Sequence, residues 1–275
     1  ARNGAVGVLV RSLTLSQDDH PHTGSTMFGD TLTTVPAVGI STNDANRLSA
    51  LLKKEKVQVF LRTHCKMFGK APSFNVIGEI RGSEHPEEII LVGGHLDSWD
   101  PSQGAHDDGA GCVHAMDALY VLKKLGYQPK RTLRCVLFMN EENGLYGGRT
   151  YADSSNLRNE FHLAAIESDA GGFTPRGFTM EGDESHFTDY LRSVQAWSGL
   201  LEPYDLFLAK GGSGADIGPL RSQKGLLIGF RPDSQRYFDF HHTAIDNIEA
   251  VNPRELQMGV GAIASLIYLI DKYGL

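Results

Sequence analysis

The residues best suited to catalysis are acidic side chains and histidines that follow apolar runs predicted to be strands. Residues 89–92 lead into GGHLDS, residues 133–139 lead into NEENG, residues 163–166 lead into ESDAG, and GAHDDGAG precedes a predicted helix. In open α/β sheets, ligands bind at the carboxyl ends of the strands. These segments therefore predict one crevice lined by carboxylates and imidazoles.

The segments GGHLDS and GAHDDGAG each hold a pair of candidate residues. His95 and Asp97 alternate along an extended chain, so they point to the same side, where Asp97 can orient His95 as a metal ligand. The alternative is a turn in which His95 caps a backbone group. Asp107 and Asp108 lie at a helix N-terminus, where an ordinary cap explains one aspartate but not two.

The adjacent pair Glu141 and Glu142 is the sharpest sign of catalysis. Adjacent side chains diverge, so one can bind a metal while the other acts as a general base toward water. A solvated loop pair is the competing interpretation. Asp169 follows another predicted strand, and YFDFHHTAID brings His241 and His242 beside aromatic residues.

This donor set contains carboxylates and imidazoles without thiolates, which suits zinc. If Asp107 bridges two ions, each ion needs two further protein ligands and an open position for water. Two zinc ions carry four positive charges, and three carboxylates would leave about one charge for a hydroxide. This charge balance favours a centre that generates hydroxide.

The elements that must position these residues alternate between strand and helix from Phe74 onward, which predicts a layered α/β domain. A helix is expected over residues 108–125, and another begins at Pro253. Cys135 belongs to a predicted central strand, and Cys112 to a core-facing helical stripe. That stripe comprises Cys112, Ala115, Met116, Leu119 and Leu122.

The first 70 residues predict a smaller α/β unit. Residues 6–10 predict a buried strand with nothing upstream to cover it, so we expect the chain to begin inside a domain. VPAVGIS and VQVFLRTHC predict further strands, and a helix is expected to begin with Thr42 as its N-cap. We place the domains at residues 1–70 and 71–275.

Composition excludes several classes of protein. The chain has 275 residues and a net charge of −7, so it lacks the basic field that would hold nucleic acid. Its 3 cysteines cannot form the framework of a disulfide-stapled module. The most apolar stretch, residues 260–270, is too short to span a membrane.

Taken together, GGHLDSWDPSQGAHDDGAG, NEENG, ESDAG and FHHTAID resemble the successive motifs of the di-zinc aminopeptidase/carboxypeptidase family. Upstream, GAVGVLVRS, HPHTG and VPAVGIST resemble the protease-associated domain inserted in some members. The resemblance implies a three-layer α/β/α zinc exopeptidase domain with a mixed central sheet. Part of a smaller protease-associated domain, N-terminally incomplete, would precede it.

The resemblance also implies a role for each candidate residue. His95 and Asp169 would hold one zinc, Glu142 and His242 the other, and Asp107 would bridge them. Glu141 would be the general base and Asp97 would orient His95. His242 is preferred to His241 because the family's ligand directly precedes Thr or Ser, and His241 is then a candidate for polarising the substrate carbonyl. His106 is the candidate decoy, and Ser213, in the loop 211–216, is a candidate substrate-binding residue.

The implied activity is zinc-dependent hydrolysis of dipeptides or short peptides that carry a free N-terminus. The alternatives are a glutamate-type carboxypeptidase, a glutaminyl cyclase with a single zinc, and a metal-free receptor-like binding domain. We expect a peptide substrate, no nucleic acid and no membrane span, and a homodimer stays open. An extracytoplasmic location (secreted, periplasmic or lysosomal) is preferred, because the family's proteins are commonly exported.

Overall fold

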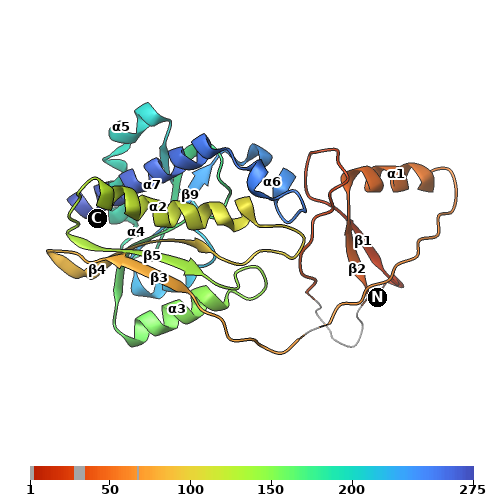
Figure 1. Ribbon diagram of the computed structural model, residues 1–275, viewed down its shortest axis with the longest axis horizontal. Coiled ribbons are helices and arrows are strands. Elements are labelled where there is room, and N and C mark those ends of the chain that lie inside the picture. Colours follow the sequence, from red (N-terminus) through yellow and green to blue (C-terminus); the bar gives the residue numbers. More distant parts are fainter. Residues whose placement is uncertain (1–2, 28–34, 67) are drawn as a thin grey trace.

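The computed structural model describes residues 3–27, 35–66 and 68–275, and it divides them between a large and a small unit (Figure 1). The large unit is built on a seven-stranded sheet with the order β3-β5-β4-β6-β9-β7-β8. Its strands are β3 (Val76–Ile80), β4 (His85–His95), β5 (Arg131–Phe138), β6 (Phe161–Glu167), β7 (Pro175–Glu181), β8 (Phe207–Lys210) and β9 (Leu226–Pro232).

The middle of this sheet is parallel, whereas both sides contain antiparallel pairs. Strands β5, β4, β6 and β9 run in one direction, and β3 and β7 pair antiparallel with β5 and β9. The expected mixed central sheet is therefore confirmed. Because the parallel strands end together, the loops that follow them meet at one edge of the sheet.

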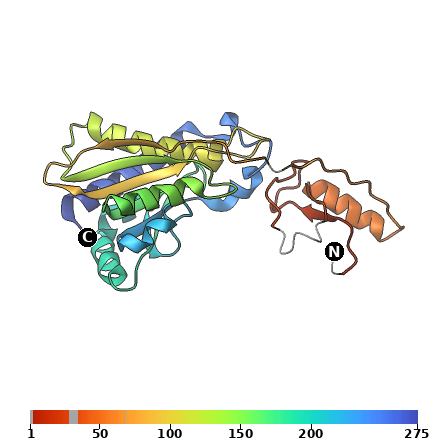
Figure 2. The ribbon, with the colours of Figure 1, turned by 90° about the horizontal axis from the view of Figure 1, so that it is seen from below.

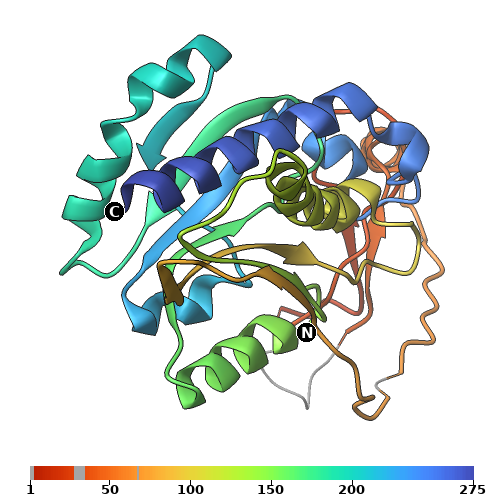
Figure 3. The same ribbon diagram turned by 60° about the vertical axis from the view of Figure 1, so that its left-hand side comes forward.

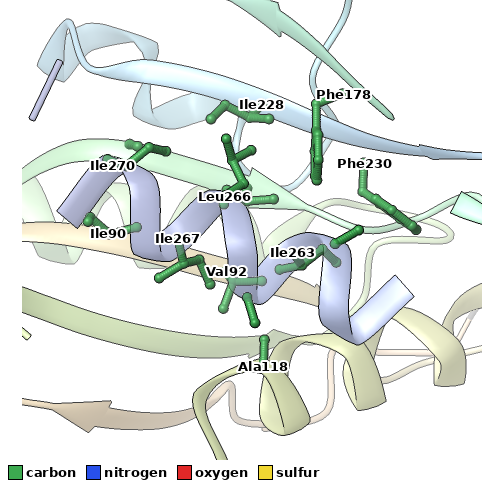
Figure 4. Packing of buried hydrophobic residues seen from close by; sticks show 14 of the residues in the cluster. Ile90, Val92, Ala118, Phe178, Ile228, Phe230, Ile263, Leu266, Ile267 and Ile270 are labelled. Carbon is green, nitrogen blue, oxygen red and sulfur yellow. The ribbon is translucent and has the colours of Figure 1, made fainter. Parts of the chain in front are cut away.

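Helices cover both faces of the sheet (Figure 3). Alternate residues of β4 belong to different cores, with Ile90 and Val92 on one side and Ile89 and Leu91 on the other. The first core packs against α2 (Ala110–Lys124), α4 (Phe187–Gln195) and α7 (Pro253–Tyr273), as Figure 4 shows for α2 and α7. The second core includes Tyr151 of α3 (Tyr146–Leu157), so the unit has three layers.

The small unit contains β1 (Val8–Arg11), β2 (Ala37–Ile40) and α1 (Thr42–Leu52). The first strand pairs parallel with the second, but the prediction that it is buried is wrong, since Val10 is 52% exposed. The predicted cap of α1 shifts by one residue, because Ser41 accepts the Asp44 amide and Thr42 is the first helical residue. An N-cap keeps extended backbone, which Ser41 has.

Two other sequence predictions need correction. VQVFLRTHC forms no strand in the described structure, where Val59 and Phe60 are exposed. High β-propensity makes no ladder without a neighbouring strand. Met116 is 48% exposed, so it lies outside the buried stripe of α2 that contains Cys112. Cys112 and Cys135 are both buried, as expected for core residues. No helix of the described residues is long and apolar enough to cross a membrane.

Buried His162 of β6 gives a prediction about acid stability. Its Nδ1 donates to Gln223 Oε1, its Nε2 accepts from the Tyr151 hydroxyl, and burial lowers its pKa to about 4. The unfolded chain binds this proton near pH 6.5 and the folded chain only near pH 4, so stability is lost as pH falls through that window. At pH 4.5 we expect a loss of roughly 2 kcal/mol from this group.

Urea unfolding at pH 7 and pH 4.5 measures this loss. The variant His162→Gln lacks the titrating ring, so its two unfolding free energies should lie closer together than those of the parent chain. His64→Gln, at an exposed histidine, is the control and should keep the parental difference. A parental difference in His162→Gln would contradict the assignment of acid sensitivity to this histidine.

Candidate metal centre

The candidate ligands lie at the carboxyl edge of the sheet or in segments that cover this edge. His95 is the last residue of β4, Glu142 follows β5, and Asp169 follows β6. Asp107 lies in the turn Ala105–Gly109, and the tandem histidines follow the short helix α6 (Tyr237–Phe240). The structure therefore brings together side chains that are far apart in the sequence.

Asp107 lies between two histidines. Its Oδ1 is 3.2 Å from His95 Nε2, and its Oδ2 is 3.2 Å from His242 Nε2. A second carboxylate approaches each histidine, with Asp169 Oδ1 3.6 Å from His95 Nε2 and Glu142 Oε2 3.1 Å from His242 Nε2. We call these groups the His95 half-site (His95, Asp107, Asp169) and the His242 half-site (His242, Asp107, Glu142).

Backbone carbonyls orient both imidazoles for metal binding. The Nδ1 of His95 is 2.9 Å from Asp97 O, and the Nδ1 of His242 is 3.2 Å from Thr23 O. A carbonyl only accepts, so Nδ1 carries the proton in each ring. The lone pair of the neutral ring is then on Nε2, which faces the carboxylates, and this is the orientation that a metal ligand requires.

The excess of carboxylates in this cluster also favours the binding of cations. Burial alone would lower the pKa of both histidines, yet the carboxylates that face their Nε2 atoms raise the pKa of His95 strongly and that of His242 to about 10. Buried Asp107 Oδ2, Glu142 Oε1 and Asp169 Oδ1 have no hydrogen-bond partner. Ligand atoms of His95, Asp107 and Glu142 lie within 4.8 Å of one another. The donor set therefore fits hard or borderline divalent cations.

Glu141 differs from its neighbour Glu142 in its surroundings. Burial raises its pKa to about 7, and the charges of Asp169, Glu142 and Asp107 act in the same direction. Bound cations would oppose this effect, because a nearby positive charge favours a carboxylate over its acid. A carboxylate beside a candidate metal site, with a pKa that its surroundings can tune, is suited to proton transfer.

Asp97 acts differently from the expectation that its carboxylate orients His95. Its backbone carbonyl accepts a hydrogen bond from His95 Nδ1, whereas its Oδ1 is 3.8 Å from that nitrogen. Its carboxylate instead accepts the amides of Glu141 and Glu142 at 3.0 and 3.3 Å. The side chain therefore fixes the turn that carries the candidate base and a candidate ligand.

Two residues named in the sequence analysis, Asp108 and Cys112, lie behind His95 and hydrogen-bond to its backbone. Buried Asp108 accepts the His95 amide and the Gly111 amide at 2.9 and 3.0 Å. Asp108 thus satisfies an amide in the first turn of α2, whereas the carboxylate of Asp107 faces the histidines. The Cys112 thiol donates to His95 O at 3.0 Å, and burial raises its pKa to about 12, so this cysteine is a hydrogen-bond donor rather than a nucleophile.

The tandem histidines stack on each other with their ring centroids 3.6 Å apart. His241 Nε2 is 3.5 Å from Asp107 Oδ2, and burial lowers the pKa of this ring to about 4. His241 therefore faces the same carboxylate as His242, and as a neutral ring it can donate or accept. The Glu142 contact belongs to His242.

The backbone and side chain of Ser213 are hydrogen-bonded to Glu181. Its amide and hydroxyl both donate to Glu181 Oε1, at 2.9 and 2.8 Å, and Glu181 also pairs with Arg221. These bonds fix the loop 211–216 to β7. A role for Ser213 in substrate binding stays a prediction, and the hydroxyl proton on which it would depend is already engaged.

Asp216, the carboxylate at the end of the loop 211–216, was not identified from the sequence. Buried Glu167 accepts the amides of Ala215 and Ile217 at 2.8 and 2.9 Å, which fixes the backbone on both sides of Asp216. Both carboxylate oxygens of Asp216 are buried without a hydrogen-bond partner. Burial raises the pKa of Asp216 to about 7, and the charges of Glu141 and Asp169 contribute. A lone aspartate after glycines gives no periodic signal that could have identified it.

His106 is a packing residue, as the decoy interpretation expected. Its ring stacks on Phe173 with centroids 4.2 Å apart, and its Nδ1 accepts the Gly172 amide at 3.1 Å. Burial lowers its pKa. Although it adjoins Asp107 in the sequence, its ring nitrogens are engaged with backbone groups.

A mixed sheet between helix layers, with two histidine–carboxylate half-sites at its carboxyl edge, defines the chain as a metallohydrolase-type α/β protein. A model of peptidase family M28 matches residues 75–267, and the chain belongs to this family. It is 34% identical to carboxypeptidase Q of Mus musculus and of Homo sapiens over 274 residues. These alignments cover 98% of this chain and 57% of each relative, so the chain spans little more than half their length.

Solved structures agree with this assignment. A peptidase M28 precursor from Shewanella amazonensis SB2B superposes with a TM-score of 0.86 and 32% identity, covering 98% of this chain and 61% of the other. BSAP, a zinc aminopeptidase from Bacillus subtilis, has a TM-score of 0.64 and 21% identity, covering 97% and 64%. The second comparison supports the fold alone.

Proposed function

We propose that the chain forms the centre of a di-zinc exopeptidase that hydrolyses dipeptides or short peptides with a free N-terminus. One observation carries this proposal: the two oxygens of Asp107 face two separate histidine–carboxylate pairs. A centre for a single ion needs no such shared carboxylate. His95 and Asp169 would hold one zinc and His242 and Glu142 the other, with Asp107 between them.

When bound, zinc supplies Lewis-acid polarisation of the scissile carbonyl and lowers the pKa of water. The chain's own residues then handle the protons. Glu141 takes a proton from the attacking water and returns it to the leaving amine. The Asp97 carboxylate keeps Glu141 in place through its backbone amide. His241, beside Asp107, is suited to contact the substrate carbonyl.

The preference for a free N-terminus rests on the excess of carboxylates. Asp216 has two buried oxygens without partners, and its pKa responds to the charges of Glu141 and Asp169, so an α-ammonium group bound nearby would favour its ionised form and pair with it. A glutamate-type carboxypeptidase would need arginines for the substrate's carboxylate. Arg149 and Arg231 could be considered for that role, but the guanidinium of Arg231 donates to Thr179 Oγ1 and Gly212 O, and Arg149 is exposed.

The test combines metal analysis with blocked substrates. We expect about two zinc ions per chain and hydrolysis of a free dipeptide, with its N-acetylated form cut at least about tenfold more slowly, since a lost charged contact costs over 1 kcal/mol. One zinc per chain would favour glutaminyl cyclisation, and zinc-free protein would favour a receptor-like domain. Preference for the acetylated form would favour the carboxypeptidase alternative.

We further propose that residues 1–70 are part of a protease-associated domain and that residues 71–275 form the peptidase domain. The separate two-stranded and seven-stranded sheets support this division. An extracytoplasmic location goes with the proposal, supported by the description of the Shewanella relative as a precursor. The sequence leaves open whether the chain forms a homodimer, and a measurement of its mass in solution answers this question.

A further inference from the structure

Residues 18–24 of the small unit lie against the candidate metal centre. In Figures 1 and 2 the short helix α6 and its following loop lie between the two units. Figure 1 shows this loop facing the unit that contains β1, β2 and α1. The segment 18–24 belongs to that unit, and it contacts His242.

Thr23 makes two backbone contacts with His242. The Thr23 amide donates to His242 O at 2.9 Å, and His242 Nδ1 donates to Thr23 O at 3.2 Å. His242 has a φ of 59°, in the left-handed region that costs energy for a residue other than glycine. The two contacts fix both the backbone and the ring of His242, so they help to hold this conformation.

Further contacts join the small unit to the segment around His242. The Thr14 hydroxyl donates to Asp239 Oδ1 at 2.7 Å, and the rings of His22 and His241 lie 6.4 Å apart. The junction therefore involves side chains on both sides of the Thr23 contact.

The small unit holds the segment 18–24 firmly. The His22 amide donates to Ser12 Oγ at 2.8 Å, and Ser12 Oγ itself donates to Ile40 O at 2.8 Å. Gly39 of β2 lies directly beneath, where a Cβ would be 2.4 Å from His22 O. The backbone that contacts His242 is thus seated on β1 and β2.

We propose that the small unit positions the metal ligand His242 through Thr23 and so completes the His242 half-site. The carbonyl of Thr23 is a positioning group: it sets which ring nitrogen carries the proton and directs Nε2 toward Asp107 and Glu142. Outer contacts of this kind change metal affinity by about 10- to 100-fold. The inference rests on the proposed two-ion function and assigns one ion's affinity to the small unit.

The test uses a pair of glycine variants in the small unit. Gly39→Ala forces the His22 carbonyl to move, whereas Gly24→Ala, in the contacting segment itself, meets nothing within 4 Å. Ser12→Ala removes the acceptor of the His22 amide without adding bulk. Stepwise zinc competition with a chromophoric chelator would measure each of the two affinities.

We expect Gly39→Ala and Ser12→Ala to weaken one zinc about tenfold or more while the other keeps its parental affinity. Gly24→Ala should match the parent. Equal loss of both ions, or parental affinities for both ions in Gly39→Ala and Ser12→Ala, would overturn the inference.

Hydrogen exchange gives a readout that needs no metal. In zinc-free protein, Gly39→Ala should speed amide exchange in the segments around Thr23 and His242 relative to Gly24→Ala. Unchanged exchange in both segments would refute the positioning role. A parent chain that binds no zinc would refute the proposed function instead, while this exchange comparison would still decide whether the small unit holds His242.

Discussion

The variant Glu141→Gln should keep its zinc and lose its turnover. Glu141 belongs to neither half-site, and its place is fixed by the bond from its amide to Asp97 Oδ1, which a glutamine retains. The amide side chain cannot accept the proton from water. General acid–base catalysis contributes about 10²- to 10⁴-fold, so we expect kcat to fall by at least about 10²-fold.

The neighbouring position provides a matched control. Glu142→Gln removes a carboxylate whose Oε2 lies 3.1 Å from His242 Nε2, so this variant should lose zinc as well as activity. Elemental analysis and dipeptide hydrolysis on the same preparations separate the two roles. Near-parental turnover in Glu141→Gln would refute its role as the base, and loss of zinc from Glu141→Gln alone would exchange the roles of the pair.

Much of the centre was predictable because strand ends converge. His95, Glu142 and Asp169 each follow an apolar run, and parallel strands bring such positions to one edge. The sequence therefore predicted the group without any knowledge of distances. Separate patterns, a helical stripe for Cys112 and a continuous apolar run for Cys135, assigned both cysteines to the core, where both lie.

The parts that escaped prediction depend on long-range contacts with no local pattern. The bond from His242 Nδ1 to Thr23 O joins residues 219 positions apart. The side chain of Asp97 was expected to orient His95. The backbone carbonyl of Asp97 accepts the His95 hydrogen bond, while its carboxylate accepts the Glu141 amide. A spacing rule identifies which side chains face one another, and it does not identify which backbone group will be nearer.

Local propensity misled at the edges of the small unit. The segment VQVFLRTHC has apolar alternation, but a strand needs a partner, and β2 pairs with β1 in the structure. The same unit still contributes to the centre through Thr23. A unit whose strands are partly exposed can therefore still help to determine the geometry of a site in the other unit.

Replacing Asp107 should have the broadest effect on metal binding. Its two oxygens each lie 3.2 Å from a different histidine, so Asp107→Ala removes one protein ligand from both half-sites. Asp169→Ala removes a ligand from the His95 half-site alone. We expect zinc to fall from about two per chain to well below one in Asp107→Ala, but to about one in Asp169→Ala.

Thermal unfolding with and without zinc checks this expectation independently of activity. A ligand that binds only the folded state stabilises it by about 2.7 kcal/mol at one hundred times its Kd, so zinc should raise the Tm of the parent chain. The increase should be smaller in Asp169→Ala and nearly absent in Asp107→Ala. If Asp107→Ala instead kept one zinc at parental affinity, Asp107 would serve a single ion, and the two half-sites would not share a ligand.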